Sequence, residues 1–87
     1  MKVNLDIPQY SESDGLVNHW EHNFTIEVSF NNNATYIKAN KAGLVSLAIQ
    51  LLTLAQDGVE AGRHFHYDHH NSLEEGSGDL IIEKTEL

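Results

Sequence analysis

The fold is decided by residues 24–58, which read FTIEVSFNNNATYIKANKAGLVSLAIQLLTLAQDG. Apolar side chains alternate with polar ones in the first seven residues, and this period of two predicts a strand over Phe24–Phe30 with one buried face. Three asparagines at positions 31–33 tolerate the left-handed conformation and predict a turn. Residues 34–39 then return as the second strand of a hairpin.

A single helix is expected directly after the hairpin, over residues 41–57. Asn40 stands where an N-cap belongs, and Gly58 is expected to end the helix as its C′ glycine. The helix is more apolar than one sheet requires, so a loop, the N-terminal segment, a protein partner or a second copy in a homodimer must cover its flank. On a helical wheel a narrow polar strip (Ser46, Gln50, Thr53, Asp57) is surrounded by apolar residues (Leu44, Val45, Leu47, Ala48, Ile49, Leu51, Leu52, Leu54, Ala55).

Three further strands are predicted outside this stretch. Residues Lys2–Ile7 form a short alternating run before it, and Arg63–Asp68 and Asp79–Lys84 form two runs of strand length after it. The order β-β-β-α-β-β favours the α+β class, with a mostly antiparallel sheet and one helix packed on one face. We expect residues 1–87 to be one domain, because 87 residues with 40% apolar content close one modest core.

Composition limits the classes of function. The sequence has no cysteine, which removes disulfides, thiolate metal sites and cysteine nucleophiles, and which fits a reducing compartment. The N-terminus lacks the apolar stretch of a secretion signal, and no apolar run reaches the roughly 18 residues of a membrane span. We therefore expect a cytoplasmic protein with no membrane partner.

The charge is strongly acidic, with 13 Asp and Glu against five Lys and Arg, a net −8. Such a field repels phosphate backbones, so nucleic acid is not an expected partner. Residues 68–87 hold six acidic residues against Lys84 alone, which accounts for five of the eight net charges. A basic protein surface is the natural complement, although net charge also serves solubility. The predicted partner-binding residues are Glu74, Glu75, Asp79 and Glu83.

The run His64-Phe65-His66-Tyr67-Asp68-His69 matches the H-x-H-x-D-H pattern of metallo-β-lactamase-fold hydrolases. Histidines two apart on a strand project from the same face and could share a zinc or nickel ion. Those hydrolases need well over about 150 residues and further ligands downstream, whereas no histidine follows His70. We therefore predict no metal and no cofactor, with a structural role for this histidine pair. A small metal-binding protein or hydrolase using His64, His66, Asp68 and His69 is the alternative.

Other catalytic signals are weak. Ser72 and Ser77 lack the strand–elbow–helix context of an esterase serine, and Gly76-Ser77-Gly78 precedes a strand and is expected to be a turn. Adjacent glutamates in a loop do not fix the carboxylate spacing that acid–base catalysis requires. No catalytic residue is therefore predicted, and the protein is not expected to be an enzyme.

One family resemblance involves the last third of the chain. After Gly62 comes His64-Phe65-His66-Tyr67-Asp68, then a short loop, then Leu73-Glu74-Glu75-Gly76-Ser77-Gly78-Asp79-Leu80-Ile81-Ile82-Glu83. This arrangement resembles immunity protein family 32 of bacterial polymorphic toxin systems. The resemblance implies a small α+β antitoxin that binds and neutralises a cognate toxin domain in the producing cell. A homo-oligomeric ligand-binding module that uses the broad apolar surface of the helix is a further alternative, independent of the resemblance. The motif residues that it singles out are His64, His66, Asp68, Gly76 and Ser77.

Overall fold

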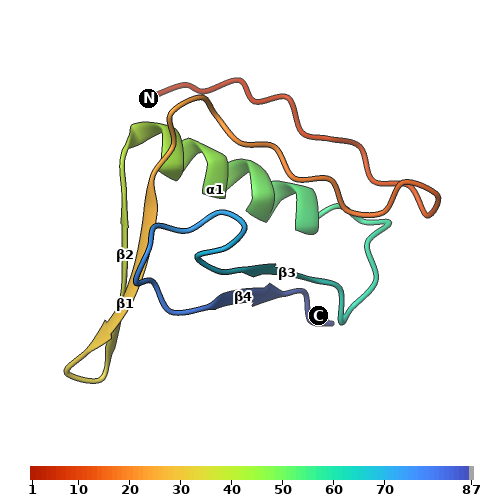
Figure 1. Ribbon diagram of the computed structural model, residues 1–87. Helices are drawn as coiled ribbons and strands as arrows, with labels where there is room; N and C mark the ends of the chain where they lie inside the picture. Colours follow the sequence, from red (N-terminus) through yellow and green to blue (C-terminus); the bar gives the residue numbers. More distant parts are fainter. Residues whose placement is uncertain (87) are drawn as a thin grey trace.

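The computed structural model describes residues 1–86 and confirms the α+β class (Figure 1). The strands pair in two antiparallel two-stranded sheets, β1 with β2 and β3 with β4, where the sequence suggested one sheet. Within the described residues, the order along the chain is β1 (Ile26–Asn31), β2 (Ala34–Ala39), α1 (Lys41–Leu54), β3 (His64–Tyr67) and β4 (Leu80–Glu83).

The β1–β2 hairpin forms as predicted. Its two-residue turn consists of Asn32 and Asn33, both with positive φ (51° and 61°), as a tight hairpin turn requires. Ile26 and Val28 are buried on the face that meets the core. Phe30 lies on the same face, opposite Thr35 in the register, but is 72% exposed. The hairpin therefore projects beyond the body of the molecule (Figure 1).

Helix α1 begins at the predicted cap and packs closely against the hairpin. The Asn40 side chain accepts a hydrogen bond from Gly43 N at 2.8 Å and another from Thr25 N at 3.0 Å. A Cβ at Gly43 would collide with the backbone oxygen of Thr25, so glycine permits this approach. The predicted end is wrong: the helix stops at Leu54 with Ala55 as its C-cap, and Gly58 is not a C′ glycine. The Ala55 N–H bonds the Leu51 carbonyl, and positive φ at Gly58 is not needed.

The part of the predicted polar strip that lies in α1 faces inward, whereas Asp57 lies beyond the end of the helix and is exposed. Ser46, Gln50 and Thr53 are fully buried, whereas Leu44, Leu51 and Leu52 are about half exposed. The Thr53 hydroxyl donates a hydrogen bond to the Ile49 carbonyl. Ser46 and Gln50 accept hydrogen bonds from backbone amides of the N-terminal segment, residues 1–24. The expected cover by that segment is therefore present, but it lies over the polar strip and leaves part of the apolar surface open.

The strand expected over Lys2–Ile7 is wrong. The N-terminal segment runs across α1 in an extended form (Figure 1), and its one ladder contact within residues 1–86 is an isolated bridge between Ser11 and Gly15. Its backbone groups bond side chains of α1 and of the residues that follow it: Gln56, two residues beyond the end of the helix, accepts from Tyr10 N at 3.0 Å and donates to the Pro8 carbonyl at 2.9 Å. These contacts replace the neighbouring strand that the alternating pattern suggested.

The second sheet closes the other side of the core. At the start of β3, Gly62 (φ 94°) and Arg63 both bond Lys84, so two residues face one in a β-bulge. Phe65 and Tyr67 point inward, and Trp20 of the N-terminal segment meets Tyr67 edge-on at 5.4 Å between ring centroids. The main buried cluster consists of Ile26, Val28, Leu47, Leu54, Val59, Phe65, Tyr67 and Leu73.

Among the described residues, no helix has both the length and the apolar character needed to cross a bilayer.

Candidate partner-binding site

One surface of the second sheet faces solvent, and we call it the outer face of β3–β4. Because side chains alternate along a strand, the residues that face the core leave the intervening ones on the opposite side. Ile81 lies in the middle of this face and is 57% exposed, although it is a large apolar residue. The outer face consists of His64, His66, Asp79, Ile81 and Glu83.

Both histidines of the outer face lie beside a carboxylate. His66 Nε2 is 2.9 Å from Asp79 Oδ2, and His64 Nδ1 is 4.0 Å from Glu83 Oε1 across the strand pair. All four side chains are about half exposed, so water screens both pairs. The predicted projection of His64 and His66 from one face of a strand is confirmed.

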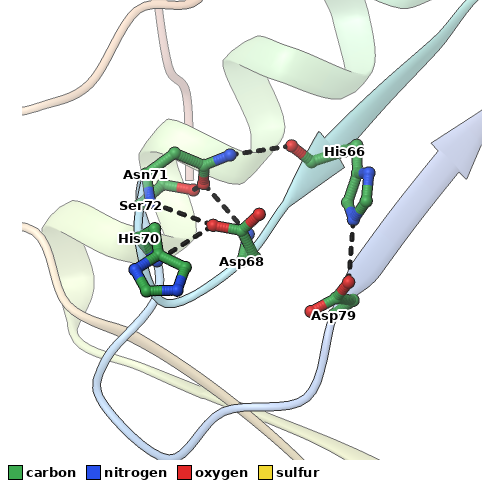
Figure 2. A network of polar contacts seen from close by, with 6 residues as sticks. All are labelled: His66, Asp68, His70, Asn71, Ser72 and Asp79. Atoms are coloured by element: carbon green, nitrogen blue, oxygen red, sulfur yellow. Dashed lines mark hydrogen bonds and ion pairs between the residues drawn. The ribbon is translucent and has the colours of Figure 1, made fainter.

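The loop after β3 is organised by Asp68 (Figure 2). Its carboxylate accepts hydrogen bonds from the backbone amides of His70 at 2.9 Å and Asn71 at 3.1 Å. Asn71 in turn accepts from the Asp68 amide and donates to the His66 carbonyl at 3.1 Å. The Asp68 carboxylate and the Asn71 side chain therefore orient the loop, whereas the His66 ring points toward Asp79 at the far end of the loop.

The glycine–serine turn fastens the loop to the first sheet. Gly76 has φ 86°, which favours glycine, and Ser77 is buried. The Ser77 hydroxyl accepts a hydrogen bond from Val28 N at 3.1 Å, and Gly78 N donates to the Val28 carbonyl at 2.9 Å. The turn therefore satisfies backbone groups of β1 that β2 does not reach.

The four predicted partner-binding residues do not form one cluster. Asp79 and Glu83 share the outer face with Ile81, whereas Glu74 and Glu75 are exposed in the turn that runs along β1. Sequence reasoning missed Ile81. Its signal was present, since it alternates with Asp79 and Glu83 in a run that was predicted to be a strand.

The H-x-H-x-D-H run does not assemble a metal-ligand set. His66 faces Asp79, the Asp68 carboxylate faces loop amides, and the His69 ring lies against the His70 ring at a tilt of 41°, with ring centroids 3.9 Å apart. Within residues 1–86, no three His, Cys, Asp or Glu side chains are placed to hold a metal ion. The geometry therefore does not support the alternative of a metallohydrolase built on this run.

Tyr67 is a buried titratable side chain with a clear perturbation of its pKa. It is 3% exposed, and this burial raises the pKa of its hydroxyl well above the usual value near 10. The hydroxyl has no hydrogen-bond partner in the described part of the chain. A neutral tyrosine packed among apolar side chains is suited to the core.

Comparison with known proteins places the chain in a family. No curated protein matches it, and no solved structure matches it. A protein-family model described as Immunity protein 32 matches residues 35–85, which span β2, α1, β3 and β4. This range is more than half of the chain and includes the bulge glycine, the outer face and the glycine–serine turn. The chain belongs to the immunity protein 32 family.

Proposed function

We propose that this protein is an immunity protein that binds a cognate toxin domain of a polymorphic toxin system and neutralises it in the cytoplasm of the producing cell. The observation that carries the proposal is the family membership over residues 35–85. The protein acts through protein–protein contact and not through catalysis. Neither a nucleic acid, a membrane nor a cofactor takes part.

The surface chemistry supports a basic partner. Residues 68–87 hold five of the eight net negative charges, and four of the carboxylates belong to exposed residues of the turn and the outer face. Lys84, the single basic residue in this range, donates to the Gln56 carbonyl at 2.6 Å and so points away from them. A positive surface would be attracted here over about 10 Å at 0.1 M salt.

The carboxylates mainly steer the encounter. Complementary charge raises the association rate, whereas most of the affinity comes from a few desolvated side chains. Glu74 and Glu75 act as steering charges, with Asp79 and Glu83 flanking a more central contact. Ile81 supplies apolar area between those two acids, and the half-exposed histidines complete a surface with both polar and apolar groups.

The test uses the C-terminal domain of the large secreted protein that we expect to be encoded immediately upstream, with its activity disabled by mutation. We call this probe the adjacent toxin domain. Changing Glu74 and Glu75 together to lysine should slow association by at least about 10-fold at low salt, and added salt should shrink the difference. The matched control changes Glu12 and Asp14, two exposed acidic residues of the N-terminal segment, together to lysine. Equal rates for wild type and the Glu74/Glu75 variant would contradict the steering role.

Self-association through α1 is the second candidate. Leu44, Leu51 and Leu52 are 56%, 50% and 48% exposed, which is unusual for three leucines on one helix. A homodimer through this surface predicts twice the monomer mass in light scattering. It also predicts a return to the monomer mass when Leu51 and Leu52 are both changed to glutamine.

A further inference from the structure

The inner face of the hairpin carries apolar side chains past the point where the core ends. In the register, Ile26 pairs with Ala39, Val28 with Ile37 and Phe30 with Thr35. Ile26 and Val28 are 0% and 4% exposed, but Ile37 is 45% and Phe30 is 72% exposed. We call Phe30, Thr35 and Ile37 the hairpin-tip face. The same face of one hairpin is therefore core at its base and open surface at its tip.

The hairpin-tip face borders the outer face of β3–β4. Gly78 N bonds the Val28 carbonyl, and the outer face begins with the next residue, Asp79. Phe30 lies two residues beyond Val28, about 7 Å further along the strand. Since β1 crosses the level of β3–β4 at this contact, the hairpin continues past β4 (Figure 1). Beyond Val28, the inner face of the hairpin therefore no longer contacts the core and lies beyond the edge of the second sheet.

Charge is distributed unevenly around this border. The hairpin-tip face has no charged side chain, and Glu27 and Lys38 face each other on the opposite side of the hairpin. Asp79 is at the border itself, and Glu74 and Glu75 belong to the turn that runs beside β1. An apolar patch bordered by carboxylates complements a protein surface with apolar groups surrounded by lysine and arginine.

We propose that the hairpin-tip face is the apolar anchor of toxin binding, with Phe30 as its principal residue, and that it docks on a basic surface of the toxin domain. The inference rests on the proposed function and adds a location to it. A large aromatic side chain that is open in the free protein and buried in the complex contributes strongly to affinity. The acidic turn then brings the partner to this anchor.

The decisive variant changes Phe30 and Ile37 together to threonine. Threonine keeps the strand propensity of the hairpin but removes most of the apolar area. We expect the dissociation constant for the adjacent toxin domain to rise at least about 30-fold, mainly through faster dissociation and with little dependence on salt. The matched control changes Leu51 and Leu52 to glutamine, which removes exposed apolar area from α1, and should alter binding by less than about 3-fold.

Each outcome separates the inference from the function it rests on. If wild type binds the adjacent toxin domain and the threonine variant binds equally well, the anchor is refuted while the immunity function stands. If wild type does not bind at all, both are refuted. A wild-type dimer that the threonine changes dissolve would assign the face to a second copy and overturn the proposal. Should the threonine variant not fold, hydrogen exchange on wild type decides: slowed exchange at residues 28–37 on binding supports the anchor, and unchanged exchange refutes it.

Discussion

The N-terminal segment and the β3–β4 pair lie on different sides of the core and are held by different means. In β3–β4, backbone groups bond one another directly in an antiparallel register. In the N-terminal segment, backbone groups bond the side chains of α1: the His19 amide and carbonyl both bond Gln50, and the Glu21 amide bonds Ser46 at 2.8 Å. Polar side chains of a helix can thus satisfy the backbone hydrogen-bonding groups of an extended segment, as a neighbouring strand does in a sheet.

This difference has a consequence for stability. The β3–β4 pair depends on backbone hydrogen bonds that no single side-chain substitution removes. The N-terminal segment depends instead on a few buried side chains. The two regions should therefore respond differently to point mutations. A mutation in the packing of α1 on the β1–β2 hairpin, on which both regions depend, should unfold both together.

The largest effect is expected where α1 packs against the β1–β2 hairpin, for Gly43→Ala. Alanine gains about 1 kcal/mol of helix propensity over glycine, but its Cβ would collide with the Thr25 backbone oxygen, which cannot easily move. Overpacking of this kind costs about 3 kcal/mol or more, so the collision outweighs the gain. We expect a net loss of at least about 2 kcal/mol in urea unfolding, with both regions melting together.

The matched control for this prediction is Gly58→Ala. A Cβ there would meet a Tyr10 ring carbon at an ordinary 3.7 Å, and no positive φ is required. The control should change the free energy of unfolding by less than about 1 kcal/mol. Equal losses for both variants would show that the close approach of α1 to the hairpin is not what restricts position 43.

The next effect separates the two regions, for Gln50→Leu. Leucine fits the apolar surroundings but leaves the His19 amide and carbonyl without their partner, at a cost of about 2 kcal/mol. Hydrogen exchange of residues 16–22 should accelerate, while the amides of β3–β4 keep their protection. Gln9→Leu, at an exposed position, is the control. A uniform acceleration over the whole chain would mean that the N-terminal segment is not a separate unit.

The sequence predicted the paired strands, which are held by backbone hydrogen bonds, well. It predicted the N-terminal segment, which is held by side chains, poorly. The strands from Phe24 onward, the asparagine turn and the Asn40 cap follow local rules of alternation and capping, and all are confirmed within a few residues. The Lys2–Ile7 strand failed because alternation reports one buried face and does not report what satisfies the backbone. The polar side of a helix usually faces solvent, but the polar strip of α1 is buried. The sequence pattern does not show this burial, which follows from the hydrogen bonds to His19 and Glu21.

The candidate site was predictable in part for the same reason. Alternation placed His64 and His66 on one face and Phe65 and Tyr67 on the other, as the structure has them. The sequence could not show that Phe30 lies beyond the core, because its pattern is that of Ile26 and Val28. Exposure at the hairpin tip depends on where β3–β4 ends, which is a property of the assembled fold.

A smaller effect concerns the contact between the regions, where Trp20 meets Tyr67. Burial raises the pKa of Tyr67, so its neutral form contributes stability below pH 10 that is lost as pH rises above the unfolded value of about 10. At pH 11 wild type should lose about 1 kcal/mol of stability relative to Tyr67→Phe, since the unfolded tyrosine ionises and phenylalanine cannot. At pH 7 the two should differ by less than about 1 kcal/mol. Urea unfolding at both pH values checks this, and an equal difference at both would contradict the assignment.

The smallest effect is expected on the outer face, for His64→Asn combined with His66→Asn. Both histidines are about half exposed, and exposed pairs contribute about 0–1 kcal/mol because water screens them and side-chain entropy opposes them. Asparagine can still bond a carboxylate, and Asp68 with Asn71 continues to organise the loop. Stability should therefore fall by less than about 1 kcal/mol, with faster exchange confined to residues near Asp79.

Asp68→Ala is the comparison variant for the small loss of stability expected in the double asparagine variant. It removes the acceptor of the His70 and Asn71 amides, and it should cost about 1–2 kcal/mol and accelerate exchange over residues 69–73. The double asparagine variant should also still bind the adjacent toxin domain. If instead its stability were unchanged while binding was abolished, the histidines would contact the toxin directly, and the toxin-binding surface would centre on Ile81 and not on Phe30.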